Sequence, residues 1–157
     1  MKRQRNAGFI CFTSLAHRTL LEHNRIYLLT ANTAGREPVF SDFFLGRMLV
    51  SQFRAAEETG LANSLAWVVM PDHFHWLIEL KSGSLGELMQ RTKSLSTKAV
   101  KLSTGRKTSL WQPGFHDRAL RKEENLVKMA RYVIANPLRA GLVKSLGDYP
   151  LWDSIWL

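Results

Sequence analysis

The sequence predicts an α+β fold of the ferredoxin-like (RRM-like) kind, in which an antiparallel sheet carries helices on one face and a C-terminal helix follows. Two observations predict it. Short β-rich runs and helical runs alternate in the order β-α-β-β-α-β, without repeats or low-complexity tracts. The chain has 157 residues, 45% of them hydrophobic and 22% charged, which suits one domain with a sizeable core. We expect a basic N-terminal arm over residues 1–24 and the domain over residues 25–157.

The first strand and helix are predicted by a β-rich run, a helix cap and a helix stop. Residues 26–30 are β-rich and lead into the turn-like residues 32–35. Ser41 and Asp42 can cap the helix that follows, and Gly60 ends it. The helical spacing of apolar residues predicts the buried side of this helix: Phe44, Leu45, Met48, Leu49, Phe53 and Ala56.

The next two strands enclose a short turn and carry a pair of histidines. Residues 65–70 form the first of these strands, and residues 71–72 turn the chain into the second. Side chains alternate along a strand, so His73 and His75 point to one face and Phe74 to the other. Two imidazoles on one face of a strand are half of a metal site on a rigid support.

The second helix has a clear start signal and two distinct sides. Ser84 and Glu87 form a capping box, in which each side chain satisfies an otherwise unpaired backbone N–H. Apolar spacing predicts the buried stripe: Leu85, Leu88, Thr92, Leu95, Ala99 and Leu102. Basic residues lie largely off that stripe and give the helix a basic side: Arg91, Lys93, Lys98 and Lys101.

The C-terminal third holds a polar loop, a short strand and a last helix. The loop covers residues 103–109, and the short strand is predicted over residues 115–120. We expect the last helix to open with Glu123 and Glu124, because acidic side chains suit the positive end of the helix dipole. It should end near residue 136, since a proline follows and disfavours helical geometry before it. The aromatic tail is expected to pack back on the domain or on nucleic acid.

The charge balance points to a polyanionic partner. Twenty-two Lys and Arg against thirteen Asp and Glu give a net charge of +9 and a pI near 10.1. Such an excess favours nucleic acid first and an anionic membrane surface second, and the alternative is a basic surface without a specific partner. Cys11 is the only cysteine, so the chain forms no internal disulfide, and a reducing cytoplasm is the expected compartment. No run is long enough to span a membrane.

The last helix carries a candidate reactive face. Asn125, Lys128, Tyr132 and Asn136 are three or four residues apart, so they share one side of the helix. If this helix crosses the sheet near the histidines, the carbonyl oxygen of Asn136 could be a third metal ligand. A bound divalent ion would polarise a phosphodiester, and the Tyr132 oxygen would attack the phosphorus. A phenol has a pKa near 10, so its ionisation would need help from the metal or Lys128.

Each of these residues also has a plainer interpretation. A His-x-His pair alone is more often a pair of surface polar residues or half of a zinc site. Tyr132 alone is most often a packing residue with a solvated hydroxyl. Asn136 before a proline is a common helix end, and Lys128 is commonly just solvated. Spacing by itself therefore leaves both interpretations open.

Three segments resemble the HUH single-tyrosine transposases. Residues 70–75, Met-Pro-Asp-His-Phe-His, followed by an apolar strand, resemble the HUH motif. Residues 111–121 resemble the stretch that precedes the catalytic helix in those proteins, and residues 130–143 are similar to the catalytic segment of the REP-associated tyrosine transposases. The resemblance runs from about Tyr27 to the end of the chain.

The resemblance implies a site and a reaction. His73, His75 and Asn136 would hold Mg²⁺, with Mn²⁺ as a substitute, and Tyr132 would be the nucleophile. The implied substrate is single-stranded DNA folded into hairpins of the REP-palindrome type, which is cleaved to a 5′-phosphotyrosine and a free 3′-hydroxyl. Many relatives carry Asn where this chain has Asp72, so Asp72 is a candidate partner for a histidine beside the metal. A monomer is favoured over a homodimer, and no membrane partner is expected.

DNA phosphates would be bound by basic side chains, and two rival functions remain. The candidates for these contacts are Arg91, Lys93, Lys98, Lys101, Arg106, Lys107, Arg118 and Arg121. The first rival is a module of the same fold that holds hairpin nucleic acid without cutting it. The second is a zinc hydrolase that uses His73, His75 and Asp72, which ranks last because no third strong zinc ligand stands at a familiar spacing.

Overall fold

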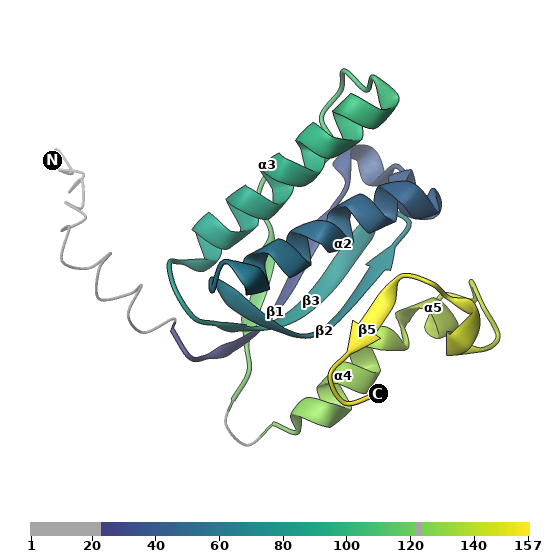
Figure 1. The fold of residues 1–157 in the computed structure, drawn as a ribbon. Coiled ribbons are helices and arrows are strands. Elements are labelled where there is room, and N and C mark those ends of the chain that lie inside the picture. The colour runs from purple at the N-terminus through teal and green to yellow at the C-terminus, as the bar shows by residue number, and fades with distance from the viewer. Residues whose placement is uncertain (1–22, 122–123) are drawn as a thin grey trace, which may run out of the picture.

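The computed structural model describes residues 23–121 and 124–157 as a five-stranded antiparallel sheet between two helical layers (Figure 1). The strands are β1 (Ile26–Asn32), β2 (Ala62–Met70), β3 (His73–Leu80), β4 (His116–Ala119) and β5 (Trp152–Ser154). The helices are α2 (Phe43–Glu58), α3 (Leu85–Thr104), α4 (Leu126–Ile134) and α5 (Asn136–Arg139), with the 3₁₀ turns η1 (Ala34–Arg36), η2 (Val39–Ser41) and η3 (Leu146–Asp148). The basic arm expected over residues 1–24 lies almost wholly outside the described residues.

The strand order β4-β1-β3-β2-β5 confirms the predicted ferredoxin-like class and adds one strand to it. The helices α2 and α3 cover one face of the sheet, and α4 packs on the other face (Figure 1). Strand β3 is central and pairs antiparallel with β1 on one side and β2 on the other. Because of this position, a side chain on β3 has neighbours from both adjoining strands.

The alternation along β3 divides its residues between two cores, as predicted. Phe74 and Trp76 are fully buried in the main core under α2 and α3. Leu77 belongs to a smaller core that α4 closes with Ala130 and Ile134. His73 and His75 lie on this second face of the sheet, since side chains two residues apart share a face.

Helix α2 begins as predicted but buries a slightly different side. The Asp42 carboxylate accepts hydrogen bonds from the backbone N–H groups of Phe44 and Leu45, so it is the N-cap. The expected burial of Phe44 is wrong, because this ring is 74% exposed. It lies one position outside the stripe that faces the sheet and the C-terminal segment: Leu45, Gly46, Leu49, Val50, Phe53 and Ala56.

Helix α3 confirms the capping box at Ser84 and Glu87 but not the second half of the expected stripe. Leu102 is 79% exposed and Leu95 also faces solvent, so their predicted burial is wrong. A small polar residue, Ser96, is buried instead, because its hydroxyl accepts a hydrogen bond of 3.1 Å from the Trp111 indole. The observed stripe is Leu85, Leu88, Met89, Thr92, Ser96 and Val100.

Helix α4 begins later than predicted. Its N-cap is Asn125, whose side chain accepts a hydrogen bond from the backbone N–H of Lys128. Glu124, expected inside the helix, instead accepts two hydrogen bonds of 2.9 Å from the Arg118 guanidinium. Glu123 lies outside the described residues. The helix ends at Ile134, and the short α5 follows at once, with Pro137 in its first turn.

The C-terminal tail packs back on the domain, which was one of its two expected positions. Strand β5 pairs with β2 at the edge of the sheet. Leu151 is buried in the main core, and the Tyr149 hydroxyl donates a hydrogen bond of 2.6 Å to the Val69 carbonyl. Across residues 23–121 and 124–157, none of the helices combines the length and the apolar character that a membrane crossing needs.

Candidate metal and tyrosine site

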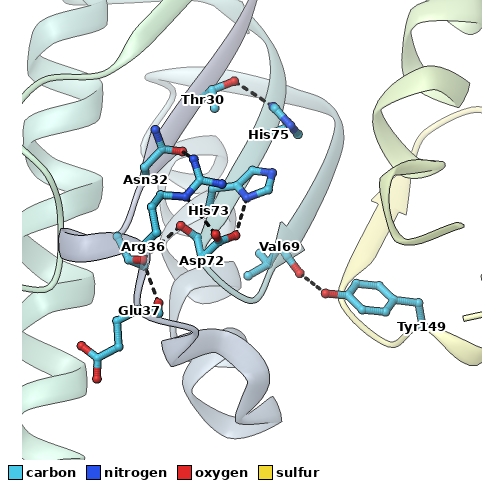
Figure 2. Close-up of polar contacts among 10 residues, drawn as sticks. Thr30, Asn32, Arg36, Glu37, Val69, Asp72, His73, His75 and Tyr149 are labelled. Carbon is cyan, nitrogen blue, oxygen red and sulfur yellow. Dashed lines mark hydrogen bonds and ion pairs between the residues drawn. The ribbon is translucent and has the colours of Figure 1, made fainter. Parts of the chain in front are cut away.

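The two histidine rings of β3 lie side by side on the α4 face of the sheet. Their centroids are 4.9 Å apart and their planes meet at 79°. Figure 2 shows that each ring is held by a different partner. The Nδ1 atom of His73 lies 2.7 Å from Asp72 Oδ1, and the Nδ1 atom of His75 lies 2.8 Å from Thr30 Oγ1. Because each Nδ1 is engaged, Nε2 is the ring nitrogen that a metal ion would take.

The charge states of His75 and Asp72 suit metal binding near neutral pH. Burial, together with the positive charges of His73 and Arg139, lowers the pKa of His75 to about 4. The ring is therefore neutral at pH 7, and a neutral imidazole is the form that binds a metal. Burial opposes the ionisation of Asp72, but hydrogen bonds from His73 and Arg36 outweigh it and hold the pKa of this carboxyl below its usual value.

The turn that carries Asp72 is fixed by the connection between β1 and α2. Thr33 is fully buried there, and both its backbone N–H and its hydroxyl donate to the Asp72 carbonyl, at 2.9 and 3.1 Å. The backbone N–H of Phe40 donates to the Pro71 carbonyl at 2.9 Å. The carbonyl groups of both turn residues thus accept hydrogen bonds from the β1–α2 connection, and these bonds hold the start of β3 in place.

Helix α4 lies on the same face of the sheet as the histidines. Its Val133 packs against Val68 and Met70 of β2. These two residues pair directly across the strands with His75 and His73. The sheet therefore satisfies the condition on which the predicted site depends, since the tyrosine-bearing helix crosses it beside the histidine pair.

Tyr132 is exposed and covered on one side by an arginine. The residue is 59% exposed, so its hydroxyl is accessible. The Arg139 guanidinium carbon lies 3.9 Å from the centroid of the Tyr132 ring, a cation–π contact. The same charge also lowers the pKa of His75, so Arg139 acts on both Tyr132 and His75.

Asn136 lies at the junction of α4 and α5, half-buried. Its amide nitrogen donates a hydrogen bond of 2.7 Å to the Val133 carbonyl. This bond engages only the amide nitrogen of the side chain, and the role of its carbonyl oxygen as a metal ligand stays a prediction. Two imidazole nitrogens and an amide oxygen suit a divalent ion that keeps open positions for phosphate oxygens. Within the part of the chain that the structure describes, no group of three or more His, Cys, Asp or Glu residues is placed to hold a metal ion.

The structure does not gather the eight predicted DNA-binding residues into one patch. Arg91, Lys98 and Lys101 are exposed on α3, in the layer opposite the histidine face. Lys107 and Arg121 are exposed in loops. These five exposed side chains are spread over separate elements.

The other three of the eight basic residues make specific contacts within the protein. The Lys93 ammonium donates to the carbonyl groups of Gln112 and Gly114 at 2.7 and 2.6 Å, and its burial lowers its pKa. Arg106 donates to Glu37 and to a backbone carbonyl, with its side chain only 15% exposed. Arg118 is paired with Glu124. These contacts give each of the three a structural role that helical spacing could not reveal.

Sequence reasoning also missed three residues around the site. Thr30 is a strand residue whose register opposite His75 gives it a role, and only the pairing of β1 with β3 shows this. Arg36 contacts Asp72 from a turn, and Arg139 contacts Tyr132 from α5. A signal for Arg139 existed, because it follows Tyr132 by seven residues, or two helical turns.

Fold and site together define an α+β protein with two histidines and a tyrosine-bearing helix on one face of its sheet. Residues 23–136 match the family model described as "Transposase IS200 like". This match covers most of the chain, so the chain belongs to the IS200-like transposase family. Family membership supports a DNA-processing enzyme and confirms the resemblance drawn from residues 70–75 and 130–143.

Individual relatives agree with this assignment. The chain is 32% identical over 87 residues to the REP-associated tyrosine transposase of Escherichia coli K12, a match that covers 54% of this chain and 50% of that protein. The chain thus spans about half the length of the curated relative it matches.

Two solved structures share the fold. The first is a REP-associated tyrosine transposase bound to a REP hairpin, with a TM-score of 0.69 and 22% identity over 97% of this chain and 82% of the other. The second is a candidate transposase from Deinococcus radiodurans R1, with a TM-score of 0.53 and 18% identity over 85% and 95%. At these identities the likeness is one of fold.

Proposed function

We propose that this chain is a metal-dependent single-stranded DNA transposase that cleaves and rejoins DNA at hairpins of the REP-palindrome type through a 5′-phosphotyrosine. The main support is the packing of α4 on the histidine face, through Val133 against the β2 neighbours of the two histidines. This packing brings the tyrosine-bearing helix and the two imidazoles to one face of one sheet. Membership in the IS200-like family supports the class of reaction.

In this proposal the Nε2 atoms of His73 and His75 and the side-chain oxygen of Asn136 hold Mg²⁺, or Mn²⁺ in its place. The ion would polarise the scissile phosphodiester and stabilise the charge that builds up on it. Asp72 and Thr30 orient the two rings through their Nδ1 atoms, so that both Nε2 atoms face the ligand. His75 needs no deprotonation at pH 7, because its pKa is about 4.

Tyr132 supplies the covalent step. Its phenol loses a proton and its oxygen attacks the phosphorus, the bond from phosphorus to the 3′-oxygen breaks, and that oxygen takes a proton to give a 3′-hydroxyl. Attack by a 3′-hydroxyl on the phosphotyrosine reverses these steps and rejoins a strand without ATP. The Arg139 guanidinium lies over the ring at 3.9 Å, where its positive charge would attract the phosphate of a bound strand.

The substrate class follows from charge and from the relatives. A net charge of +9 suits a polyanion, and phosphate contacts supply most of the affinity for such a ligand. The solved relative with the higher TM-score is bound to a REP hairpin, and the Escherichia coli relative is a REP-associated tyrosine transposase. We expect a monomer, because α4 packs on the sheet of its own chain.

Incubation with labelled hairpin DNA and Mg²⁺ tests the proposal. Wild-type protein should form a covalent protein–DNA adduct, and Tyr132→Phe should form none, because phenylalanine has no oxygen to attack phosphorus. Tyr149→Phe is a matched control that removes another tyrosine hydroxyl and should leave the adduct unchanged near neutral pH. Mass spectrometry of the adduct should locate the nucleotide on Tyr132.

Two outcomes would contradict the proposal in different ways. Tight hairpin binding without an adduct in the wild type would favour the non-catalytic binding module. DNA hydrolysis that survives in Tyr132→Phe and depends on zinc would favour the hydrolase that uses His73, His75 and Asp72.

A further inference from the structure

A continuous chain of hydrogen bonds leads from the β1–α2 connection to one of the two histidines. Arg36 Nε donates to Asp72 Oδ2 at 2.8 Å, and Arg36 Nη1 donates to Asn32 Oδ1 at 3.2 Å. The other oxygen of the same carboxylate accepts from His73 Nδ1 at 2.7 Å. Figure 2 shows the four side chains in this sequence, with the Arg36 fork between Asn32 and Asp72.

The backbone around Arg36 takes an uncommon form that aims this side chain at the turn. Arg36 has a φ of 54°, and the preceding Gly35 has a φ of 62°. Positive φ is rare for residues other than glycine, so it is kept only where neighbouring contacts hold it. Those contacts are present on both sides: the buried Thr33 bonds to the Asp72 and Glu37 carbonyl groups, and the Glu37 side chain pairs with Arg106.

The two histidines differ in how much support their partners need. Thr30, the partner of His75, is fixed by its place on β1, where it lies directly opposite His75 in the sheet. Asp72, the partner of His73, stands in a turn with 26% of its side chain exposed, so its carboxylate could rotate towards solvent. Arg36 is the group that holds this carboxylate in the position that faces the ring.

We propose that Arg36 is the positioning residue for His73: it fixes the Asp72 carboxylate, which holds Nδ1 of the ring as the donor and leaves Nε2 as the nitrogen for the metal. A carboxylate can only accept a hydrogen bond, so the nitrogen that faces it carries the proton. The hydrogen bond at one ring nitrogen sets which nitrogen is free to bind a metal. The metal-binding part of this inference rests on the proposed function, whereas the tautomer of His73 in the metal-free protein does not.

The alternative is an ordinary surface ion pair between Arg36 and Asp72. The Arg36 side chain is 51% exposed, and exposed pairs of this kind contribute little to stability. A melting temperature would therefore not separate the two interpretations. The state of the His73 ring does separate them, because an ion pair without a positioning role has no effect on which ring nitrogen is protonated.

The experiment measures the His73 tautomer and the metal affinity in matched variants. Metal-free protein labelled with ¹⁵N-histidine should show His73 as a single tautomer with the proton on Nδ1. In Arg36→Met both tautomers should become populated, and the affinity for Mn²⁺ should fall about tenfold. Arg36→Lys, which keeps the charge and a donor, should recover part of both properties. Lys81→Met is the control, since it breaks the exposed ion pair with Glu79, a residue on the same strand as His73.

The outcomes separate this inference from the proposed function. Wild-type tautomer and Mn²⁺ affinity in Arg36→Met would overturn the role of Arg36. If the wild type binds no Mn²⁺ through its histidines, the metal site of the proposed function fails, while the ¹⁵N spectrum still decides whether Arg36 controls the ring. Should Arg36→Met not fold, Arg36→Ala replaces it with the same expectation, because it also removes every side-chain donor to Asp72.

Discussion

His73 and His75 are chemically identical residues placed in different environments. His75 is held by a hydroxyl on a neighbouring strand, and burial keeps its ring neutral. His73 is held by a carboxylate in a turn, and that carboxylate is itself held by Arg36. In the proposed metal site, the ring that faces a carboxylate would be a stronger ligand than the ring that faces a hydroxyl, so the pair would offer one stronger and one weaker donor.

Tyr149 offers a test of the structure that is independent of catalysis. Burial raises the pKa of its phenol to about 12, and its hydroxyl donates to the Val69 carbonyl (Figure 2). A raised pKa means that the folded protein favours the protonated phenol. The resulting stability is complete below pH 10, the ordinary pKa of tyrosine, and is lost as the pH rises towards 12.

We expect wild-type protein to exceed Tyr149→Phe in free energy of unfolding by about 1 kcal/mol at pH 9, the typical value of one hydrogen bond. This difference should shrink between pH 10 and pH 12, because only the wild type carries the titrating phenol. Urea unfolding followed by circular dichroism at both ends of this range measures it. A difference that stays constant would show that the Tyr149 hydroxyl is solvated.

At the scale of secondary-structure elements, the capping signals of α2 and α3 predict the structure correctly, whereas the buried side of each helix, which depends on packing, is predicted only in part. Asp42 and the pair Ser84 and Glu87 are recognisable as caps because a cap depends only on residues within one turn. The burial of Ser96 in place of Leu95 could not be predicted, because it depends on Trp111, which is fifteen residues away in the chain. When two overlapping sets of residues on one helix could each form its buried side, the sequence does not decide between them until the neighbouring element is known.

The candidate site divides in the same way. The shared face of His73 and His75 follows from the two-residue period of a strand, and that of Lys128 and Tyr132 follows from the helical period. Asn136, expected on the same helix face, stands in α5 beyond the end of α4. From the sequence, the contact of α4 with the histidine face can only be assumed, because residue spacing does not determine how a helix crosses a sheet. Arg36 could not be found, because a left-handed turn brings it to a residue thirty-six positions away.

The N-cap of α4 should be worth a measurable amount of stability. Asn125→Ala removes the acceptor for the Lys128 backbone N–H, and the free energy of unfolding should fall by about 1 kcal/mol. Asn125→Ser keeps a capping oxygen and should retain most of the wild-type value. Denaturant titration of the three proteins measures the effect. Equal stability of the alanine and serine variants would mean that the side chain does not cap this helix in solution.

At the scale of the whole molecule, basic side chains are spread over both faces. The exposed lysines of α3 lie in the layer opposite the histidines, whereas Lys128 and Arg139 lie on the α4 side. A hairpin that contacted both groups would have to extend around an edge of the sheet. The edge strand β4 is short, and its side chains are all exposed.

Salt dependence shows whether the far layer contacts DNA. We expect Lys98→Gln combined with Lys101→Gln to weaken hairpin binding and to reduce the slope of log affinity against log salt by roughly 0.7 to 0.9 for each phosphate that these lysines neutralise. Fluorescence anisotropy measured from roughly 50 to roughly 200 mM salt gives both quantities. An unchanged slope would mean that these two lysines do not contact DNA phosphates and that the DNA contacts only the histidine side.

The packing of α4 on its own sheet bears on how the rate of the proposed reaction depends on protein concentration. In the proposed monomer, the chain's own α4, packed through Val133 beside the β2 neighbours of the histidines, would supply the tyrosine without a second copy. The reaction is then first order in protein, and dilution leaves the yield per molecule unchanged. A cell that makes only a few copies of the chain would keep the full activity of each one.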